Sequence, residues 1–408
     1  MDVSTSKKNI TAILVISALG YFVDIYDLIL FSIVRKVSLL SLGLSGTEIF
    51  DYGVLLINMQ MGGMLIGGII WGILGDKKGR ISVLFGSIFL YSVANIANGF
   101  VVDVTQYAIL RFIAGVGLAG ELGAGITLVS EVMPKETRGY GTMVVATVGI
   151  FGAVVAALVG DYFDWRTAYF IGGGMGLALL VMRIGVYESG MYSSIKESDV
   201  LKGGFHKLFT DKKNFIKYLH CISVGLPIWF IVGVLITFSP EFAKAFGLKE
   251  EIQAGKAVMY CYIGLAIGDL LSGALSQFYK SRKKIIGFFI ILEGIFIIAY
   301  LFFNKVDATF FYTLCLMLGV SGGYWAVFVT NAAEQFGVNI RATVTTTVPN
   351  FVRGAVVPAT FLFQYLTPDI GIVKAALYVG IGAVAIAYIS MTKLEETFGK
   401  DLNYVEKH

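Results

Sequence analysis

Charged residues are scarce in this chain, and their scarcity excludes an ordinary soluble protein. Only 15% of the 408 residues are charged, whereas 56% are hydrophobic and the mean hydropathy is +0.77. Soluble domains carry about 25% charged residues. Each unpaired charge in a lipid core costs several kcal/mol, so this depletion indicates a chain that lies largely within a membrane.

Histidine and cysteine are also rare, with three residues of each type. Cys221, Cys261 and Cys315 lie within apolar runs and lack the spacing of metal ligands, and His206 and His408 lie in polar segments. We therefore expect no metal, no cofactor and no nucleophile–base pair of an enzyme. The chain also lacks the Gly-x4-Gly-Lys-Ser/Thr loop that binds ATP. Its net charge of +4 is too dispersed to indicate a nucleic-acid partner.

Long apolar runs dominate what is present. A helix needs about 20 apolar residues to cross a bilayer, and twelve such runs occur, six on either side of a polar, lysine-rich stretch. The runs cover residues 10–34, 52–74, 81–101, 105–130, 140–160, 166–186, 214–238, 256–278, 285–303, 309–333, 343–366 and 371–391. We predict an all-α membrane protein of twelve transmembrane helices in two six-helix bundles. The bundles are predicted at 1–187 and 214–408, the second with a short cytoplasmic tail, and the linker at 188–213.

Lysine and arginine are distributed unequally between the loops. The face with both termini and the linker carries 21 of them, and the opposite face carries 8. Positive charge is retained on the cytoplasmic side, so we predict a protein of the plasma (inner) membrane with cytoplasmic termini and linker. Only Arg111, Arg183 and Arg353 lie within apolar runs.

The two halves of the sequence resemble each other. Glu131 and Arg138, separated by six residues, follow the fourth run, and Glu334 and Arg341 follow the tenth at an offset of 203 residues. Basic loops also follow the second and eighth runs. Parallel repeats of this kind are a common plan of secondary transporters, whose sites lie between the halves.

Two motifs carry a resemblance to a known family. Gly-Ile-Leu-Gly-Asp-Lys-Lys-Gly-Arg at residues 72–80 resembles the signature loop of the major facilitator superfamily, and Arg-Phe-Ile-Ala-Gly at residues 111–115 resembles a second motif of that superfamily. With the repeat included, the resemblance covers the whole chain. It implies the twelve-helix fold and a transport function.

A narrower resemblance concerns acids in the membrane. Arg111 and Glu121 resemble the Arg-x9-Glu pattern of metabolite:proton symporters, which carry carboxylates and zwitterions. Asp24 and Asp27 are similar to the paired acids of those carriers and of phosphate:proton symporters. The phosphate group has an acid four residues after a tryptophan of helix 7, a position that Gly233 occupies here.

Asp24 and Asp27 stand three residues apart on one face of the first predicted helix. Two neighbouring carboxylates in a low dielectric cannot both ionise cheaply, so at least one is expected to gain and lose a proton. We predict that both take part in proton coupling. The alternative is that Asp27 is solvated near the extracellular end or caps a kink.

Arg111 and Glu121 share the fourth predicted helix, about 15 Å apart along its axis. Arginine stays charged and binds carboxylates in a bidentate manner, so Arg111 is a candidate substrate anchor. Glu121 is the foremost candidate for the proton-coupling site. Alternatively, Glu121 is a structural partner of Arg353 or another basic group.

Arg353 lies in the eleventh run between Pro349 and Pro358. An arginine inside a membrane helix requires a partner or water, so Arg353 is predicted to bind an anionic substrate, or a carboxylate such as Glu121 in its absence. Asp269 is a further candidate for proton coupling. Glu293 is expected to face a neighbouring helix or lipid headgroups.

Aromatic and amide residues of the central helices are predicted to line the substrate site, although each of them could serve packing or anchoring instead. These residues are Tyr26, Trp229, Tyr324, Trp325, Asn331 and Gln364.

Charged residues at the cytoplasmic helix ends are predicted to form ion pairs that hold one conformation closed. Single surface pairs contribute about 0–1 kcal/mol, so several are needed. Orientation by positive charge explains the lysines in these loops but not the acids. The proposed gating residues are Asp76, Arg80, Glu131, Arg138, Glu334 and Arg341.

Together these features predict a monomeric secondary active transporter that moves a small organic anion or zwitterion by alternating access, with proton symport as the energy source. Efflux by antiport, uniport and phosphate symport share most of the features. A membrane-embedded enzyme, a gated channel and a solute sensor fit the sequence less well, because reactive residues are few and the two-half repeat favours rocking over a fixed pore.

Overall fold

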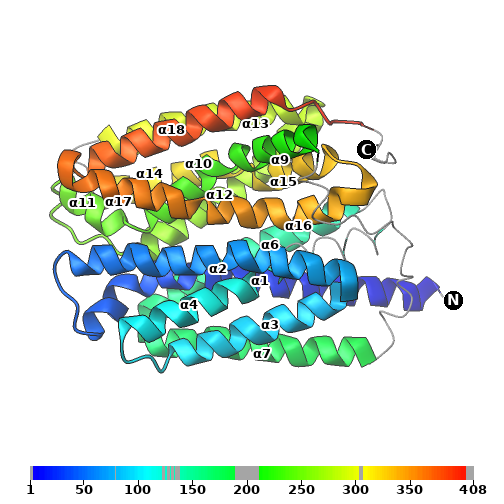
Figure 1. Cartoon of the computed structure of the whole chain (residues 1–408), viewed down its shortest axis with the longest axis horizontal. Coiled ribbons are helices and arrows are strands. Elements are labelled where there is room, and N and C mark those ends of the chain that lie inside the picture. Colours follow the sequence, from blue (N-terminus) through cyan, green and yellow to red (C-terminus); the bar gives the residue numbers. More distant parts are fainter. Residues whose placement is uncertain are drawn as a thin grey trace.

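The computed structural model describes residues 3–78, 80–121, 125, 129, 133, 138–188, 211–302 and 307–400, and the regular elements within them are all helices. Two layers of helices lie side by side: one holds α1 to α7 and the other α9 to α18 (Figure 1). The predicted linker at 188–213 falls almost wholly outside the described residues.

The described residues of the N-terminal layer form six helices. Its elements are α1 (Val3–Ser41), α2 (Glu48–Lys78), α3 (Arg80–Asn98), α4 (Val104–Leu118), α6 (Arg138–Tyr162) and α7 (Trp165–Glu188). The C-terminal layer also has six segments, three of which are divided into shorter helices. Its elements are α9 (Lys212–Val224), α10 (Leu226–Phe230), η1 (Ile231–Ile236), α11 (Ser239–Ala245), α12 (Ala254–Phe278), α13 (Arg282–Phe302), α14 (Ala308–Gly322), α15 (Trp325–Glu334), α16 (Val338–Gly354), α17 (Val356–Ile370) and α18 (Ile372–Lys393).

Each of the twelve apolar runs corresponds to one helix or to one divided helix. Among the described residues, eight helices are long and apolar enough to cross a membrane, and α9 with α10 and η1 adds a ninth span bent by 43°. Large apolar side chains are exposed on the outer faces, for example Phe151, Phe288 and Phe361. Such faces suit contact with lipid, where apolar exposure carries no penalty.

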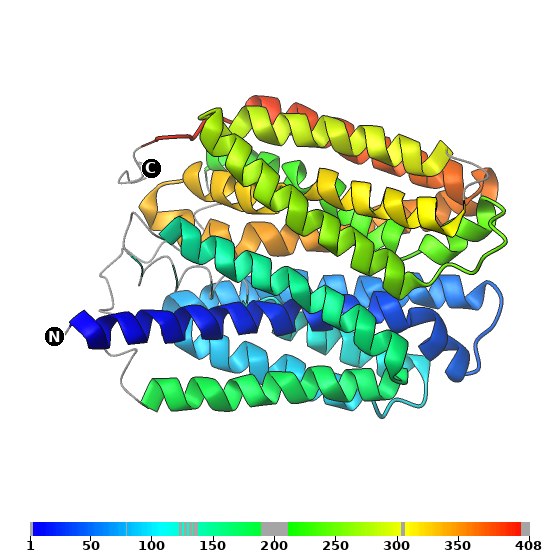
Figure 2. The same ribbon diagram turned by 180° about the vertical axis from the view of Figure 1, so that it is seen from behind.

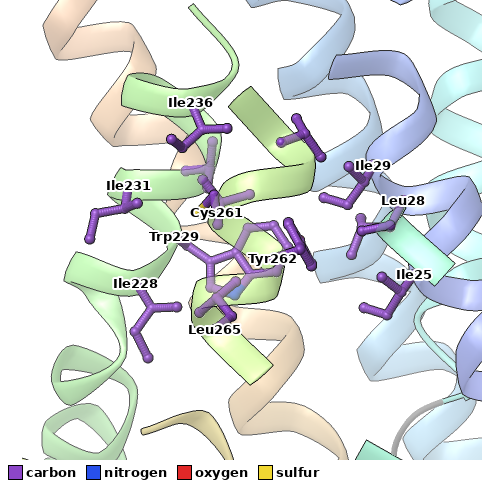
Figure 3. Close-up of a cluster of buried hydrophobic side chains, with 14 of the residues drawn as sticks. Ile25, Leu28, Ile29, Ile228, Trp229, Ile231, Ile236, Cys261, Tyr262 and Leu265 are labelled. Atoms are coloured by element: carbon purple, nitrogen blue, oxygen red, sulfur yellow. The ribbon is translucent and has the colours of Figure 1, made fainter. Parts of the chain in front are cut away.

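Both termini lie at one end of the molecule, which we call the terminal end, and the opposite end is the distal end (Figures 1 and 2). The layers meet where α2 packs against α16 and α17 and where α6 packs against α12. Between them, Ile25, Leu28 and Ile29 of α1 lie across from Trp229 and Tyr262 of the C-terminal layer (Figure 3).

Two spans are interrupted at positions related by the 203-residue repeat. The helix α4 ends at Leu118, and α14 ends at Gly322 before α15 resumes. A Cβ on Gly323 would collide with the backbone of Gly268, so only glycine allows the close approach of α12 at this point. Interrupted helices leave backbone groups that need other partners.

Side chains supply those partners at both interruptions. Near the end of α4, Trp71 Nε1 donates to the Val116 carbonyl at 2.6 Å, and Asn350 Nδ2 of the other layer donates to the Ala119 carbonyl at 2.8 Å. At the start of α15, Asp269 Oδ1 accepts a hydrogen bond from the Ala326 amide at 3.1 Å. These contacts fix the two breaks in place.

Candidate functional site

Arg353 and Asp24 meet where the two layers face each other. Arg353 comes from α16 and Asp24 from α1, and both side chains are fully buried. The closest approach, from Arg353 Nη1 to Asp24 Oδ2, is 3.7 Å. This is a long ion pair, held by residues of opposite halves of the chain.

Aromatic side chains surround the Arg353 guanidinium. Its central carbon lies 5.5 Å from the ring centroid of Trp229 and 6.0 Å from that of Trp325. The two indoles are themselves 6.4 Å apart in an edge-to-face arrangement. Tyr21 of α1 and Tyr262 of α12 lie within electrostatic reach of the same guanidinium. Figure 3 places Trp229 and Tyr262 side by side beneath the apolar side chains of η1.

Hydrogen bonding leaves Arg353 incompletely satisfied. None of its three guanidinium nitrogens makes a standard hydrogen bond with a described residue, and neither carboxylate oxygen of Asp24 accepts one. A buried charged group without such partners is costly. A guanidinium held beside aromatic rings, whose donors make no standard hydrogen bond with described residues, can bind a carboxylate through two parallel hydrogen bonds.

Arg111 and Asp27 form a second centre inside the N-terminal layer, away from Arg353. The Arg111 guanidinium donates to Gln60 of α2 and lies 5.2 Å from the ring centroid of Phe31. Asp27 is fully buried and faces Gly172 of α7, with Arg111 within electrostatic reach. The structure therefore groups Arg111 with an acid, whereas the sequence suggested that it borders the substrate.

Glu121 forms a buried ion pair with Arg183 of α7. Both nitrogens of the guanidinium fork donate to the two carboxylate oxygens, and Nη1 also donates to the Leu84 carbonyl at 3.1 Å. Sequence reasoning noted that Arg183 lies in an apolar run but gave it no role. The suggested pairing of Glu121 with Arg353 is thus corrected: each arginine has a different carboxylate, Arg183 with Glu121 and Arg353 with Asp24.

Several predicted site residues lie apart from Arg353. The Tyr26 hydroxyl donates to the Ala168 carbonyl at 2.9 Å and so faces α7. Asn331 accepts a hydrogen bond from Thr397 near the terminal end. Gln364 donates to Asp51 at 2.7 Å near the distal end. Of the predicted substrate-binding set, the Arg353 cluster contains Trp229 and Trp325 directly.

Tyr324 and the remaining acids have structural partners. The Tyr324 hydroxyl lies 3.0 Å from Glu293 Oε2 and 3.0 Å from the Val224 carbonyl, so Glu293 faces neighbouring helices of its own layer. Asp269 is the acid that caps α15. Both contacts hold the interrupted tenth span against its neighbours.

The distal end is sealed by polar contacts between the layers. Arg35 of α1, which is 1% exposed, forms an ion pair of 2.5 Å with Glu241 of α11 and donates to the Thr237 carbonyl. The Thr237 hydroxyl also lies 3.0 Å from that of Ser32. Sequence reasoning missed Arg35, although a charged residue directly after an apolar run is a weak signal for such a seal.

An exposed pair accompanies this seal. Lys36 and Glu251 lie 2.7 Å apart, and the hydrogen bond from Lys36 holds the pKa of Glu251 below its usual range. Because both side chains are well exposed, water screens their attraction, and the pair is expected to contribute little to the seal.

At the terminal end, the predicted gating residues are only partly described. Glu334 forms an ion pair of 2.7 Å with Arg282 of α13, within its own layer. Glu131 lies outside the described residues, as do the side chains of four others. These four are Asp76, Arg80, Arg138 and Arg341.

Comparison with known proteins agrees with this geometry. The family model of the Major Facilitator Superfamily matches residues 17–357. The structure of the proton:xylose symporter XylE bound to 6-bromo-6-deoxy-D-glucose superposes with a TM-score of 0.74 over 98% of each chain, at 16% sequence identity. The predicted all-α fold of two six-helix bundles is thereby confirmed.

Two curated relatives from Acinetobacter baylyi are transporters. The niacin transporter NiaP is 28% identical over 312 residues, which cover 69% of this chain and 70% of NiaP. The cis,cis-muconate transport protein is 26% identical over 352 residues, which cover 81% of this chain and 84% of that protein. These relatives confirm the expectation of a transporter rather than an enzyme.

Proposed function

The chain belongs to the major facilitator superfamily, and from this premise we propose that it carries a small planar carboxylate across the plasma membrane by alternating access, in symport with a proton. The terminal end would face the cytoplasm, as the distribution of basic residues predicts. The distal seal would close the extracellular side in the conformation described above.

The environment of Arg353 is the observation that carries the proposal. Its guanidinium is fully buried between the two halves, and its nitrogens lack standard hydrogen-bond partners among the described residues. A substrate carboxylate would supply those partners. Arginine suits this role better than lysine because its planar fork matches the two carboxylate oxygens.

The aromatic residues favour a planar, unsaturated substrate body. Trp229 and Trp325 present ring faces and edges next to the guanidinium, and stacked or edge-to-face contacts with an unsaturated group contribute about 0.5–1.5 kcal/mol beyond area burial. Niacin and cis,cis-muconate, which name two relatives, are both planar unsaturated carboxylates.

Asp24 supplies a simple basis for proton coupling. While Asp24 is ionised it is the anion opposite Arg353, at 3.7 Å. A substrate carboxylate that binds Arg353 would displace it, and a displaced buried carboxylate is stabilised by binding a proton. One carboxylate and one proton would then cross together without net charge.

Uptake into proteoliposomes tests the proposal. Radiolabelled benzoate and nicotinate are compared with cyclohexanecarboxylate, which has the same charge without planarity, and with benzamide, which has the ring without the charge. We expect accumulation of the two aromatic acids under an inward proton gradient, and little uptake of the other two. Equal uptake of cyclohexanecarboxylate would remove the argument for planarity, and uptake indifferent to the gradient would indicate a uniporter.

A further inference from the structure

A series of buried polar side chains runs through the interior of the N-terminal layer, separate from the Arg353 cluster. No member is more than 2% exposed. From the distal end inward, the interior polar series consists of Ser38, Tyr107, Tyr169, Arg111, Gln60, Asp27, Asn95, Tyr91, Glu121 and Arg183. Polar side chains inside a membrane protein are expensive to bury, so an ordered series of ten requires an explanation.

The distal part of the series is joined by direct contacts. The Tyr107 hydroxyl lies 3.4 Å from Ser38 Oγ and 2.7 Å from the Tyr169 hydroxyl. The Arg111 guanidinium lies 5.8 Å from the Tyr169 ring centroid and donates to Gln60. Polar groups thus continue from the distal end to the level of Asp27.

The inner part follows one face of α3. Tyr91, Asn95 and Asn98 stand at intervals of four and three residues, which places them in a stripe along the helix. Asn95 faces Asp27, and Tyr91 lies within electrostatic reach of both Asp27 and Glu121. The stripe therefore connects Asp27 with the Glu121–Arg183 pair.

Many atoms of the series make no standard hydrogen bond with the part of the chain that the structure describes. Both oxygens of Asp27, both side-chain polar atoms of Asn95, the Tyr91 hydroxyl, and Nε and Nη1 of Arg111 make no standard hydrogen bond with the described residues. Each buried polar atom without a partner costs about 1–3 kcal/mol. Internal water molecules, which make about three hydrogen bonds each, are the usual partners of such atoms.

We infer that the interior polar series holds a file of ordered water molecules that conducts protons between the distal side and Asp27, apart from the substrate site. This inference rests on the proposed proton coupling. Asp24 lies one helical turn from Asp27, so a proton on Asp27 can pass to the acid opposite Arg353. The titratable or charged groups that face Asp27 come from four helices: Asp24 and Tyr26 of α1, Tyr91 of α3, Arg111 of α4, and Tyr169 of α7.

The position of the series explains why a separate route is useful. The Arg35–Glu241 pair joins the two layers at the distal end. Ser38 Oγ lies 3.0 Å from the Arg35 carbonyl, so the series begins beside that seal but inside one layer. Protons can therefore reach the paired acids from the distal side while the substrate site is closed to it.

Radiolytic hydroxyl-radical footprinting tests for the water file directly, because buried tyrosines are oxidised only where water lies beside them. We expect oxidation of Tyr91 and Tyr107, but not of Tyr300, a buried tyrosine of the C-terminal layer whose hydroxyl donates to Leu235. Asn95→Leu should abolish the oxidation of Tyr91. The control Ser92→Ala, on the same helix, removes a hydroxyl already bonded to Ile88 and should have no effect. Absence of oxidation at Tyr107 or at Tyr91 in the native protein overturns the inference.

Transport assays separate this inference from the proposed function. In proteoliposomes with radiolabelled benzoate, Asn95→Leu should retain counterflow, which needs no net proton movement, and should lose accumulation driven by a proton gradient. Normal accumulation by Asn95→Leu would place the proton route elsewhere. If the native protein itself shows no proton-driven accumulation, the proposed coupling fails, and the footprint of Tyr91 still decides whether the water file exists.

Discussion

Asp24 and Arg353 come from opposite halves of the molecule, yet their charged groups lie 3.7 Å apart and are both fully buried. Neither group is fully hydrogen-bonded by described residues. A well-made structural ion pair is short and joined by two parallel hydrogen bonds, as the Glu121–Arg183 pair is. The loose pair between the halves is thus suited to exchange its partners.

Asp24→Asn is expected to separate binding from coupling. Asparagine keeps the size of the side chain but cannot gain or lose a proton, and it no longer competes for Arg353. We expect counterflow of benzoate with an unchanged or lower KM, and no accumulation under a proton gradient. Asp161→Asn, at the distal end of α6, is the matched control and should accumulate normally. Accumulation by the Asp24 variant would assign coupling to another acid.

Arg353→Lys is expected to weaken substrate binding although the charge is kept. Lysine lacks the planar fork, and loss of one charge-assisted hydrogen bond costs about 1.5–3 kcal/mol, equivalent to at least a tenfold rise in KM. Arg353→Gln should bind the substrate still more weakly and raise the KM further. Initial rates against benzoate concentration give these values. Arg166→Gln, in the first turn of α7 beside Trp165, serves as the control, and an unaltered KM in both Arg353 variants contradicts the proposed anchor.

Glu121→Gln is expected to reduce stability, because it leaves the Arg183 charge buried without its acid. Breaking a buried pair costs about 3–5 kcal/mol, whereas replacing both partners by apolar residues is often neutral. Thermal unfolding in detergent should therefore show a markedly lower Tm for Glu121→Gln. The Tm should recover in the double variant Glu121→Leu with Arg183→Met. A stable Glu121→Gln variant that has lost only its proton coupling would return Glu121 to the role of coupling site.

Glu241→Gln is expected to raise the population of conformations in which the distal seal is open. Loss of one partner leaves Arg35 buried without its acid, which shifts the balance of conformations by about 1.4 kcal/mol or more, a tenfold change in population. Labelling of Ser32→Cys by a membrane-impermeant maleimide from the distal side reports this change. The exposed Lys36–Glu251 pair offers the control, since Glu251→Gln should leave the labelling rate unchanged. Equal labelling in both variants would show that Arg35 does not hold the seal.

The sequence predicts much of this fold because a lipid environment makes hydropathy a strong signal. Each of the twelve apolar runs contains at least one described helix, and the charged residues that interrupt the runs, Asp24 and Arg353 among them, are conspicuous in such surroundings. The roles assigned to individual residues stay predictions.

The pairing of charged residues was harder to predict than their positions in the helices. Glu121 meets Arg183, and Arg353 meets Asp24, but nothing local in one sequence indicates which distant helix faces which. Uncharged polar residues such as Asn95 and Gln60 were missed because they interrupt an apolar run far less visibly than an ionised group does. The break after Gly322 was missed for a different reason: glycine is so frequent here that a Gly-Gly pair is a weak sign of an interrupted helix.

The Asp24–Arg353 contact also bears on how the cell's proton gradient is conserved. The negative charge belongs to one half and the positive charge to the other. Moving the halves apart while neither charge has another partner would therefore separate opposite charges in a medium of low dielectric constant. Within the proposed cycle, a carrier loaded with neither substrate nor proton would therefore resist turning over, and so would one loaded with only a proton, whose bare guanidinium has no counter-ion. The pair that binds the substrate would thus also prevent proton leak, because carriers without substrate could not dissipate the proton gradient.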